Sequence, residues 1–174
     1  MMETIIVIDD FYQNPDQVRQ FALRQEFFVK GNFPGPRSAP VLNDSITNWR
    51  IDPYEYNGAY QFSIQGDVTL YMLTLQLGPG VVYLTPHAPP ANAGTAFFRH
   101  LQTGIEFYPE EPEQRRRVDE DSSAWDRWAV TDQIGNRLNR LISFRGARFH
   151  SSQGHFGNSK EDARLFQTFF NTTY

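Results

Sequence analysis

Short apolar runs that end in turns recur along the chain between residues 59 and 170. Runs rich in β-branched and aromatic residues indicate strands, and the glycines and prolines between them indicate turns. The expected strands are 59–64, 68–77, 81–84, 95–98, 138–144, 147–150 and 164–170. Many short strands at this spacing are typical of a sandwich or barrel. We therefore predict a mainly β fold with flanking helices, a double-stranded β-helix (jelly roll, cupin-like).

The first thirty residues have a different pattern. Residues 4–8 predict a strand, and Asn14 is a favourable cap for a helix that holds Pro15 in its first turn. We expect this helix to end near Gly31. The strand and helix, about residues 4–30, should pack on the outside of the β core.

Two further segments are expected to lie outside the core. Residues 31–45 carry glycines and prolines without a usable period, which predicts a long ordered loop. Residues 106–121 contain seven acidic residues around the arginines 115–117, so we expect an exposed, solvated insertion rather than a nucleic-acid-binding patch. A short helix should follow, capped by Ser122 or Ser123 and running through Trp125 and Trp128, with Ile134 as its furthest extent.

Composition excludes several classes of protein. At 174 residues the chain is sized for one domain, 1–174. The absence of cysteine excludes disulfides, thiolate zinc sites, iron–sulfur clusters and a cysteine nucleophile. A net charge of -4 argues against nucleic acid or an anionic membrane as partners. We expect no signal peptide and no transmembrane segment, because no apolar run approaches the ~20 residues that a membrane span needs.

Three residues are candidates for chemistry. Alternation along the predicted strand 147–150 places Phe149 and His150 on opposite faces, so one of them points inward. An inward histidine is either a metal ligand or a hydrogen-bonded structural residue. Arg164 begins a strand of core residues, and a half-buried guanidinium needs an anion, which is an internal carboxylate or a bound small acid. Tyr83 could add a hydroxyl group to the same pocket.

Six segments in order resemble the 2-oxoglutarate- and Fe(II)-dependent oxygenases, and in particular the small prolyl-4-hydroxylase-like proteins of bacteria and phages. The segments are 14–19, 31–35, 82–86, 94–100, 149–152 and 163–170. The resemblance implies Fe(II) and 2-oxoglutarate as cofactors, and hydroxylation of a protein side chain or a small molecule. It also implies that His150 is the distal iron ligand, that Arg164 binds the far carboxylate of 2-oxoglutarate, and that Tyr83 assists. A cytoplasmic or virion-associated location would fit such proteins.

One departure from this pattern concerns the iron site. The family holds iron by a His-x-Asp/Glu pair as well, and no such pair occurs anywhere in this sequence. By approximate register, Met72 and Thr74 occupy the two ligand positions. A thioether and a hydroxyl are poor ligands for Fe(II), which favours imidazole and carboxylate.

Three explanations of this departure remain open at this point. In the first, a natural protein of the oxygenase fold has lost its iron and now serves as a binding or scaffold protein. In the second, the sequence is an altered version of such a protein. In the third, His87 or His100 forms an iron site with Asp67 in an unexpected register. We expect both histidines on the surface or in loops. The sequence thus leaves two functions: a 2-oxoglutarate-dependent dioxygenase, and a non-catalytic binding or structural module on the same fold.

Overall fold

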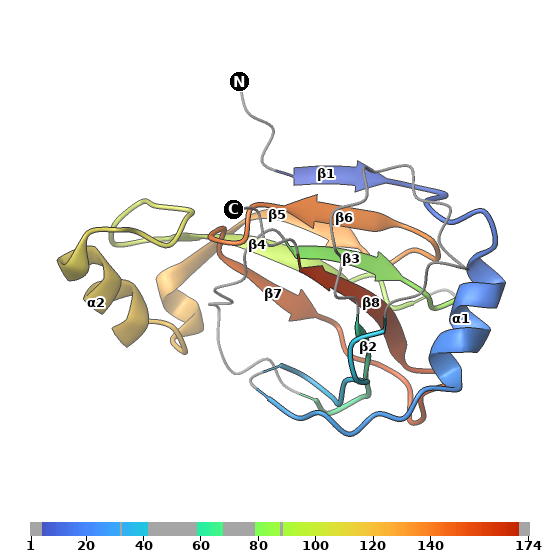
Figure 1. Cartoon of the computed structure of the whole chain (residues 1–174). Coiled ribbons are helices and arrows are strands. Elements are labelled where there is room, and N and C mark those ends of the chain that lie inside the picture. Colours follow the sequence, from blue (N-terminus) through green and yellow to red (C-terminus); the bar gives the residue numbers. More distant parts are fainter. Residues whose placement is uncertain (1–4, 32, 42–58, 68–78, 88, 171–174) are drawn as a thin grey trace.

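The computed structural model describes residues 5–31, 33–41, 59–67, 79–87 and 89–170. Its elements are β1 (Ile5–Ile8), α1 (Pro15–Leu23), β2 (Ala59–Ser63), β3 (Pro79–Tyr83), β4 (Gly94–His100), α2 (Pro112–Glu120), the 3-10 helix η1 (Trp125–Arg127), β5 (Trp128–Gly135), β6 (Leu141–Phe144), β7 (His150–Gln153) and β8 (Arg164–Phe170) (Figure 1). The expected strand 68–77, with Met72 and Thr74, lies outside the described residues. Among the helices of the described part, none has the length and apolar character needed to cross a membrane.

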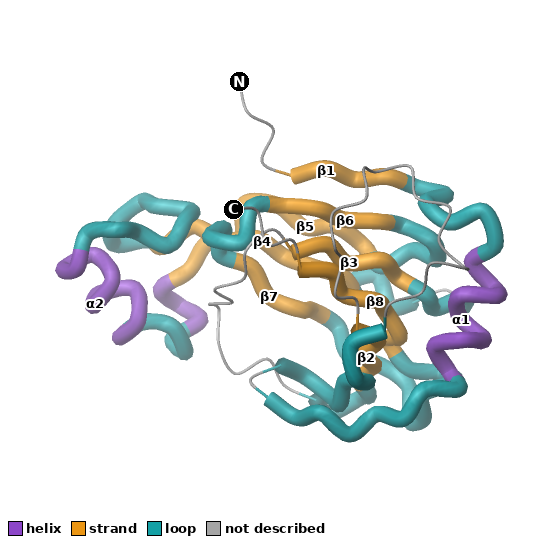
Figure 2. The backbone as a smooth tube through the Cα atoms, in the orientation of Figure 1, coloured by secondary structure: helices purple, strands orange, loops and turns teal. Residues whose placement is uncertain are grey.

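The strands form two antiparallel sheets. The five-stranded sheet has the order β1-β6-β3-β8-β2, and the three-stranded sheet has the order β5-β4-β7 (Figure 2). From β5 onward the chain alternates between the sheets, because β6 and β8 belong to the first and β7 to the second. This arrangement confirms the predicted mainly β, jelly-roll fold.

Alternation along the strands separates two apolar layers. Tyr83, Phe97, Ile142, Phe144 and Phe166 come from both sheets and pack together between them. The opposite face of the five-stranded sheet packs against α1, through a cluster that includes Val18, Ala22, Val82, Leu84, Leu141, Leu165 and Phe169. Residues 164, 166 and 168 of β8 thus face the space between the sheets, and the odd-numbered residues face α1.

Helix α1 is shorter than predicted. It ends at Leu23 rather than near Gly31. The reason lies in the aromatic and β-branched residues that follow, because the amides of Phe28 and Val29 both donate to the Arg37 carbonyl oxygen at 3.0 Å. Extended pairing with residue 37 therefore replaces further helical turns.

The acidic segment also differs from the prediction. Instead of a solvated loop throughout, it contains α2, whose Val118 is fully buried beside Trp128. The exposed face carries ion pairs one turn apart, Arg117 with Glu113 at 2.6 Å and Arg116 with Glu120 at 3.5 Å. The predicted short helix is present only as η1 (Trp125–Arg127), because Trp128 begins β5 and pairs with β4.

Asn139 joins the N-terminal segment to the sheet. Its side-chain oxygen accepts from the Tyr12 amide at 2.8 Å, its side-chain nitrogen donates to the Tyr12 carbonyl at 2.9 Å, and its φ of 63° lies in the left-handed region. Asn139→Ala loses two buried hydrogen bonds and keeps the unfavourable backbone, so we expect a loss of about 3 kcal/mol of unfolding free energy. Urea denaturation measures this loss. Asn139→Gly should recover about 1 kcal/mol of it, since glycine tolerates that φ; equal stability of the two variants would contradict the backbone part of the argument.

Candidate functional site

The Arg164 side chain lies between the two sheets. Arg164 is the first residue of β8 and its side chain is fully buried. Its Nη2 donates to the Gly94 carbonyl oxygen of β4 at 2.9 Å, so the guanidinium reaches across to the other sheet. Aromatic rings flank it, with the ring centres of Phe166 and Tyr83 at 4.4 and 5.2 Å from Cζ. These rings stabilise a cation without neutralising it.

Among the described residues, Arg164 takes part in none of the ion pairs. Its buried Nε and Nη1 have no hydrogen-bond partner there either. Burial lowers the pKa of Arg164, and the neighbouring Tyr83 partly offsets this shift. A buried cation in this state favours a bound acid as its counter-ion over an internal carboxylate, at least within the described part of the chain.

Tyr83 lies beside this cation. It is the last residue of β3, is fully buried, and its hydroxyl oxygen lies 2.8 Å from the Thr95 Oγ1 of β4. Two polar contacts therefore connect the sheets at this end, one through Tyr83 and one through Arg164. The structure brings together the arginine and the tyrosine that the sequence singled out, while their role in binding stays a prediction.

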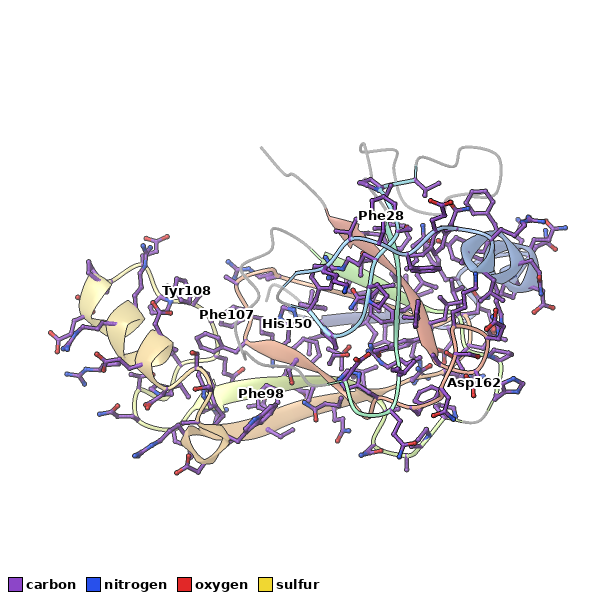
Figure 3. All side chains as sticks on the ribbon, turned by 90° about the horizontal axis from the view of Figure 1, so that it is seen from below. Phe28, Phe98, Phe107, Tyr108, His150 and Asp162 are labelled. Atoms are coloured by element: carbon purple, nitrogen blue, oxygen red, sulfur yellow. The ribbon has the colours of Figure 1, made fainter. Side chains whose placement is uncertain are left out.

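His150 also faces the space between the sheets. It begins β7, rather than ending a strand as predicted, and lies opposite Phe97 of β4. Its ring centre is 4.5 Å from that of Phe144, whereas Phe149 packs on the other face, 4.8 Å from Trp128. Figure 3 shows His150 between the body of the molecule and the α2 end.

The protonation state of His150 is the one that a metal-coordinating histidine needs. Its Nδ1 lies 2.7 Å from the carbonyl oxygen of Arg148, which can only accept, so Nδ1 carries the proton and Nε2 the lone pair. Burial lowers the pKa of His150 to about 4. The imidazole is therefore neutral at pH 7, the form that coordinates metals.

The strand register relates the two ends of this inner space. Thr95, whose hydroxyl contacts Tyr83, lies opposite Ser152, and Phe97 lies opposite His150. Two residues along a strand span roughly 7 Å. The polar end with Arg164 and the imidazole of His150 are thus separated along the strands by about the length of a small dicarboxylate.

The other two candidate histidines lie elsewhere. His100 is fully buried, so the expectation of a surface residue is wrong; its nitrogens contact Thr103 Oγ1 at 2.8 Å and Asp121 Oδ2 at 3.0 Å. His87 is exposed after β3, and Asp67 accepts from the Ile64 amide within a turn at 2.8 Å. Among the described residues there is no group of three or more histidines and acids that could hold a metal ion.

One polar pair near Arg164 was missed from the sequence. Ser63, the last residue of β2, lies directly opposite Arg164 in the sheet, and its Oγ is 2.9 Å from Nδ1 of His155. Ser63 is fully buried. Nothing local in the sequence marks this pair, because the loop after β7 brings His155 to Ser63 across 92 residues of sequence.

Together these features define the class: a jelly roll with an inward histidine between its sheets and a buried arginine that has no ion-pair partner among the described residues. No protein-family model matches the sequence, and no curated protein matches it. Solved structures of HygX from Streptomyces hygroscopicus are similar. The form with nickel, 2-oxoglutarate and hygromycin B bound has a TM-score of 0.60 at 16% identity, over 98% of this chain and 84% of that one. The iron-bound form has a TM-score of 0.56 at 13% identity, over 98% and 83%. These likenesses show a shared fold.

Proposed function

We propose that this protein is a 2-oxoglutarate-binding member of the 2-oxoglutarate- and Fe(II)-dependent dioxygenase class, of the prolyl-4-hydroxylase-like type. The observation that carries the proposal is the buried Arg164, which has Nε and Nη1 donors without partners among the described residues. HygX, which shares the fold, was crystallised with 2-oxoglutarate bound. The proposal assigns the same ligand class to the space between the sheets here.

The chemistry of this space fits a dicarboxylate. The planar guanidinium of Arg164 offers two parallel donors to the far carboxylate, and the Tyr83 hydroxyl can add a third. The keto-acid end of the ligand would then extend along β4 toward His150. Among the described residues, the groups around the arginine are hydroxyl groups, aromatic rings and a carbonyl oxygen, so the ligand would supply the negative charge.

The residues fit iron less well. His150 could coordinate a metal ion through Nε2. In this class of enzyme the metal ion would act as a Lewis acid and bind oxygen. A facial triad needs two more ligands, and the sequence contains no His-x-Asp/Glu pair, with Met72 and Thr74 at the expected positions. These residues therefore do not support a catalytic step through iron. This observation favours the second candidate function, a non-catalytic binding or structural module on the same fold.

Anaerobic reconstitution separates the two functions. We expect wild-type protein to bind 2-oxoglutarate by calorimetry with or without Fe(II), to hold substoichiometric iron, and to release no succinate above background once dioxygen is admitted. His150→Ala should leave 2-oxoglutarate affinity within about twofold of wild type, because the histidine is neutral and is remote from the far carboxylate that Arg164 binds.

Two results would change this picture. Stoichiometric iron that disappears in His150→Ala, together with succinate release, would establish a catalytic hydroxylase. An absence of any 2-oxoglutarate binding by the folded wild-type protein would overturn the proposal itself.

A further inference from the structure

The Ser63–His155 pair lies at the Arg164 end of the space between the sheets, which we call the anion end. Ser63 is the cross-strand neighbour of Arg164, so their side chains share one face of the sheet. The imidazole Nδ1 of His155 lies 2.9 Å from the buried Ser63 Oγ. The imidazole therefore lies at the end of the sheet where Arg164 begins β8.

The loop that carries His155 is held closely on both sides. Gly154 has a φ of +61°, and a Cβ there would lie 2.5 Å from the Cα of Ala93. The carbonyl oxygen of Gly157 accepts from the Gln65 amide at 2.9 Å, which ties the loop to the end of β2. Close backbone contacts thus position His155, rather than its own side-chain packing alone.

Burial and the nearby charge of Arg164 keep the imidazole of His155 neutral. Burial, followed by the field of Arg164, lowers the pKa of His155 to about 4, while Asp67 acts in the opposite direction. Ser63, its hydrogen-bond partner, carries no charge. At pH 7 an uncharged imidazole therefore lies beside a buried cation that lacks an internal counter-ion among the described residues.

We propose that His155, oriented by Ser63, is a second binding residue for the carboxylate that Arg164 receives; this inference rests on the proposed function. The Ser63 hydroxyl donates to Nδ1, which places the imidazole proton on Nε2, and Nε2 donates to a carboxylate oxygen. The anion end then holds the carboxylate between one charged donor, the guanidinium of Arg164, and one neutral donor, the imidazole of His155; we call these two groups the clamp. It selects ligands with a terminal carboxylate over those with a neutral end.

The clamp couples binding to a proton. A bound carboxylate offsets the field of Arg164, so the pKa of His155 rises in the complex toward its ordinary value of 6.5. Between about pH 4 and the raised pKa of the complex, the complex then holds more protons than the free protein. Affinity should therefore rise as the pH falls from 7.0 to 5.5, and this rise should depend on His155.

Calorimetric titration of the full chain with 2-oxoglutarate at pH 7.0 and 5.5 tests the inference. We expect His155→Gln to bind about tenfold more weakly at pH 5.5 and to lose the pH dependence that wild type shows, with Ser63→Ala intermediate. His87→Gln, at an exposed histidine, is the matched control and should behave as wild type. Ionisation of the ligand is common to all the proteins and cancels in the comparison.

The outcomes separate this inference from the proposed function. If wild type binds 2-oxoglutarate and Arg164→Ala does not, yet His155→Gln keeps both the affinity and the pH dependence of wild type, the inference is wrong and the proposed function stands. If folded wild type binds no 2-oxoglutarate, the proposed function fails first. Thermal unfolding of each variant shows whether a loss of affinity reflects a loss of fold, and Ser63→Ala provides the smaller perturbation.

Discussion

Replacing Arg164 with alanine is expected to weaken 2-oxoglutarate binding at least about a hundredfold. Hydrogen bonds to charged groups contribute about 1.5–3 kcal/mol each, and about 1.4 kcal/mol corresponds to a tenfold change in affinity. Loss of a two-pronged contact therefore exceeds any other single change in the inner space. Titration calorimetry measures the effect directly.

Stability and affinity should change in opposite directions at this position. Arg164→Met keeps the length of the side chain and removes a buried charge that has no counter-ion among the described residues. We expect this variant to unfold at an equal or higher temperature than wild type while losing the ligand. Arg137→Met, at an exposed arginine, controls for the change in net charge. An Arg164 variant that binds within threefold of wild type would refute the assignment.

Gly94→Ala is expected to reduce the unfolding free energy by at least about 3 kcal/mol, because the backbone must move to relieve a clash. A Cβ at this position would overlap the carbonyl oxygen of Ile134 on β5, and it would lie 3.1 Å from the Asn136 amide. The carbonyl of Gly94 also accepts from Arg164. The substitution therefore disturbs the pairing of β4 with β5 and the seat of the guanidinium together.

A second glycine provides the control for this prediction. Gly104 has a φ of +72°, but no atom lies within 4 Å of a Cβ built there. Gly104→Ala should lose only the cost of the left-handed backbone, about 1 kcal/mol. Denaturant unfolding of both variants separates the two causes, and equal losses would show that steric overlap at Gly94 is not the source.

Local pattern was enough to predict the fold class but not every element. The strand 164–170 was predicted with its observed bounds because its residues are strongly β-forming and a turn precedes them. Helix α1 and strand β5 differ because their ends depend on tertiary partners, namely residue 37 and strand β4. His100 was misplaced for the same reason, since its buried imidazole contacts Asp121 and Trp128, which lie more than twenty residues further along the chain.

The candidate site divides in the same way. Arg164 stood out because a cation among core residues requires an explanation, and its burial bears this out. Alternation left Phe149 and His150 as equal choices for the inward position, and the pairing with β4 selects His150. Ser63 and His155 could not be foreseen, because the register of β2 against β8 places Ser63 opposite Arg164, and a contact across 92 residues places His155 beside Ser63.

The aromatic rings that flank Arg164 have a consequence for the entropy of binding. A free arginine side chain loses up to about 2 kcal/mol of rotamer freedom when it is immobilised. Here Phe166, Tyr83 and the Gly94 carbonyl already restrict the guanidinium in the folded protein. The loss of rotamer freedom therefore occurs when the protein folds, rather than when the ligand binds. An incoming carboxylate therefore meets a donor that is already ordered, and it has no ion pair to break among the described residues.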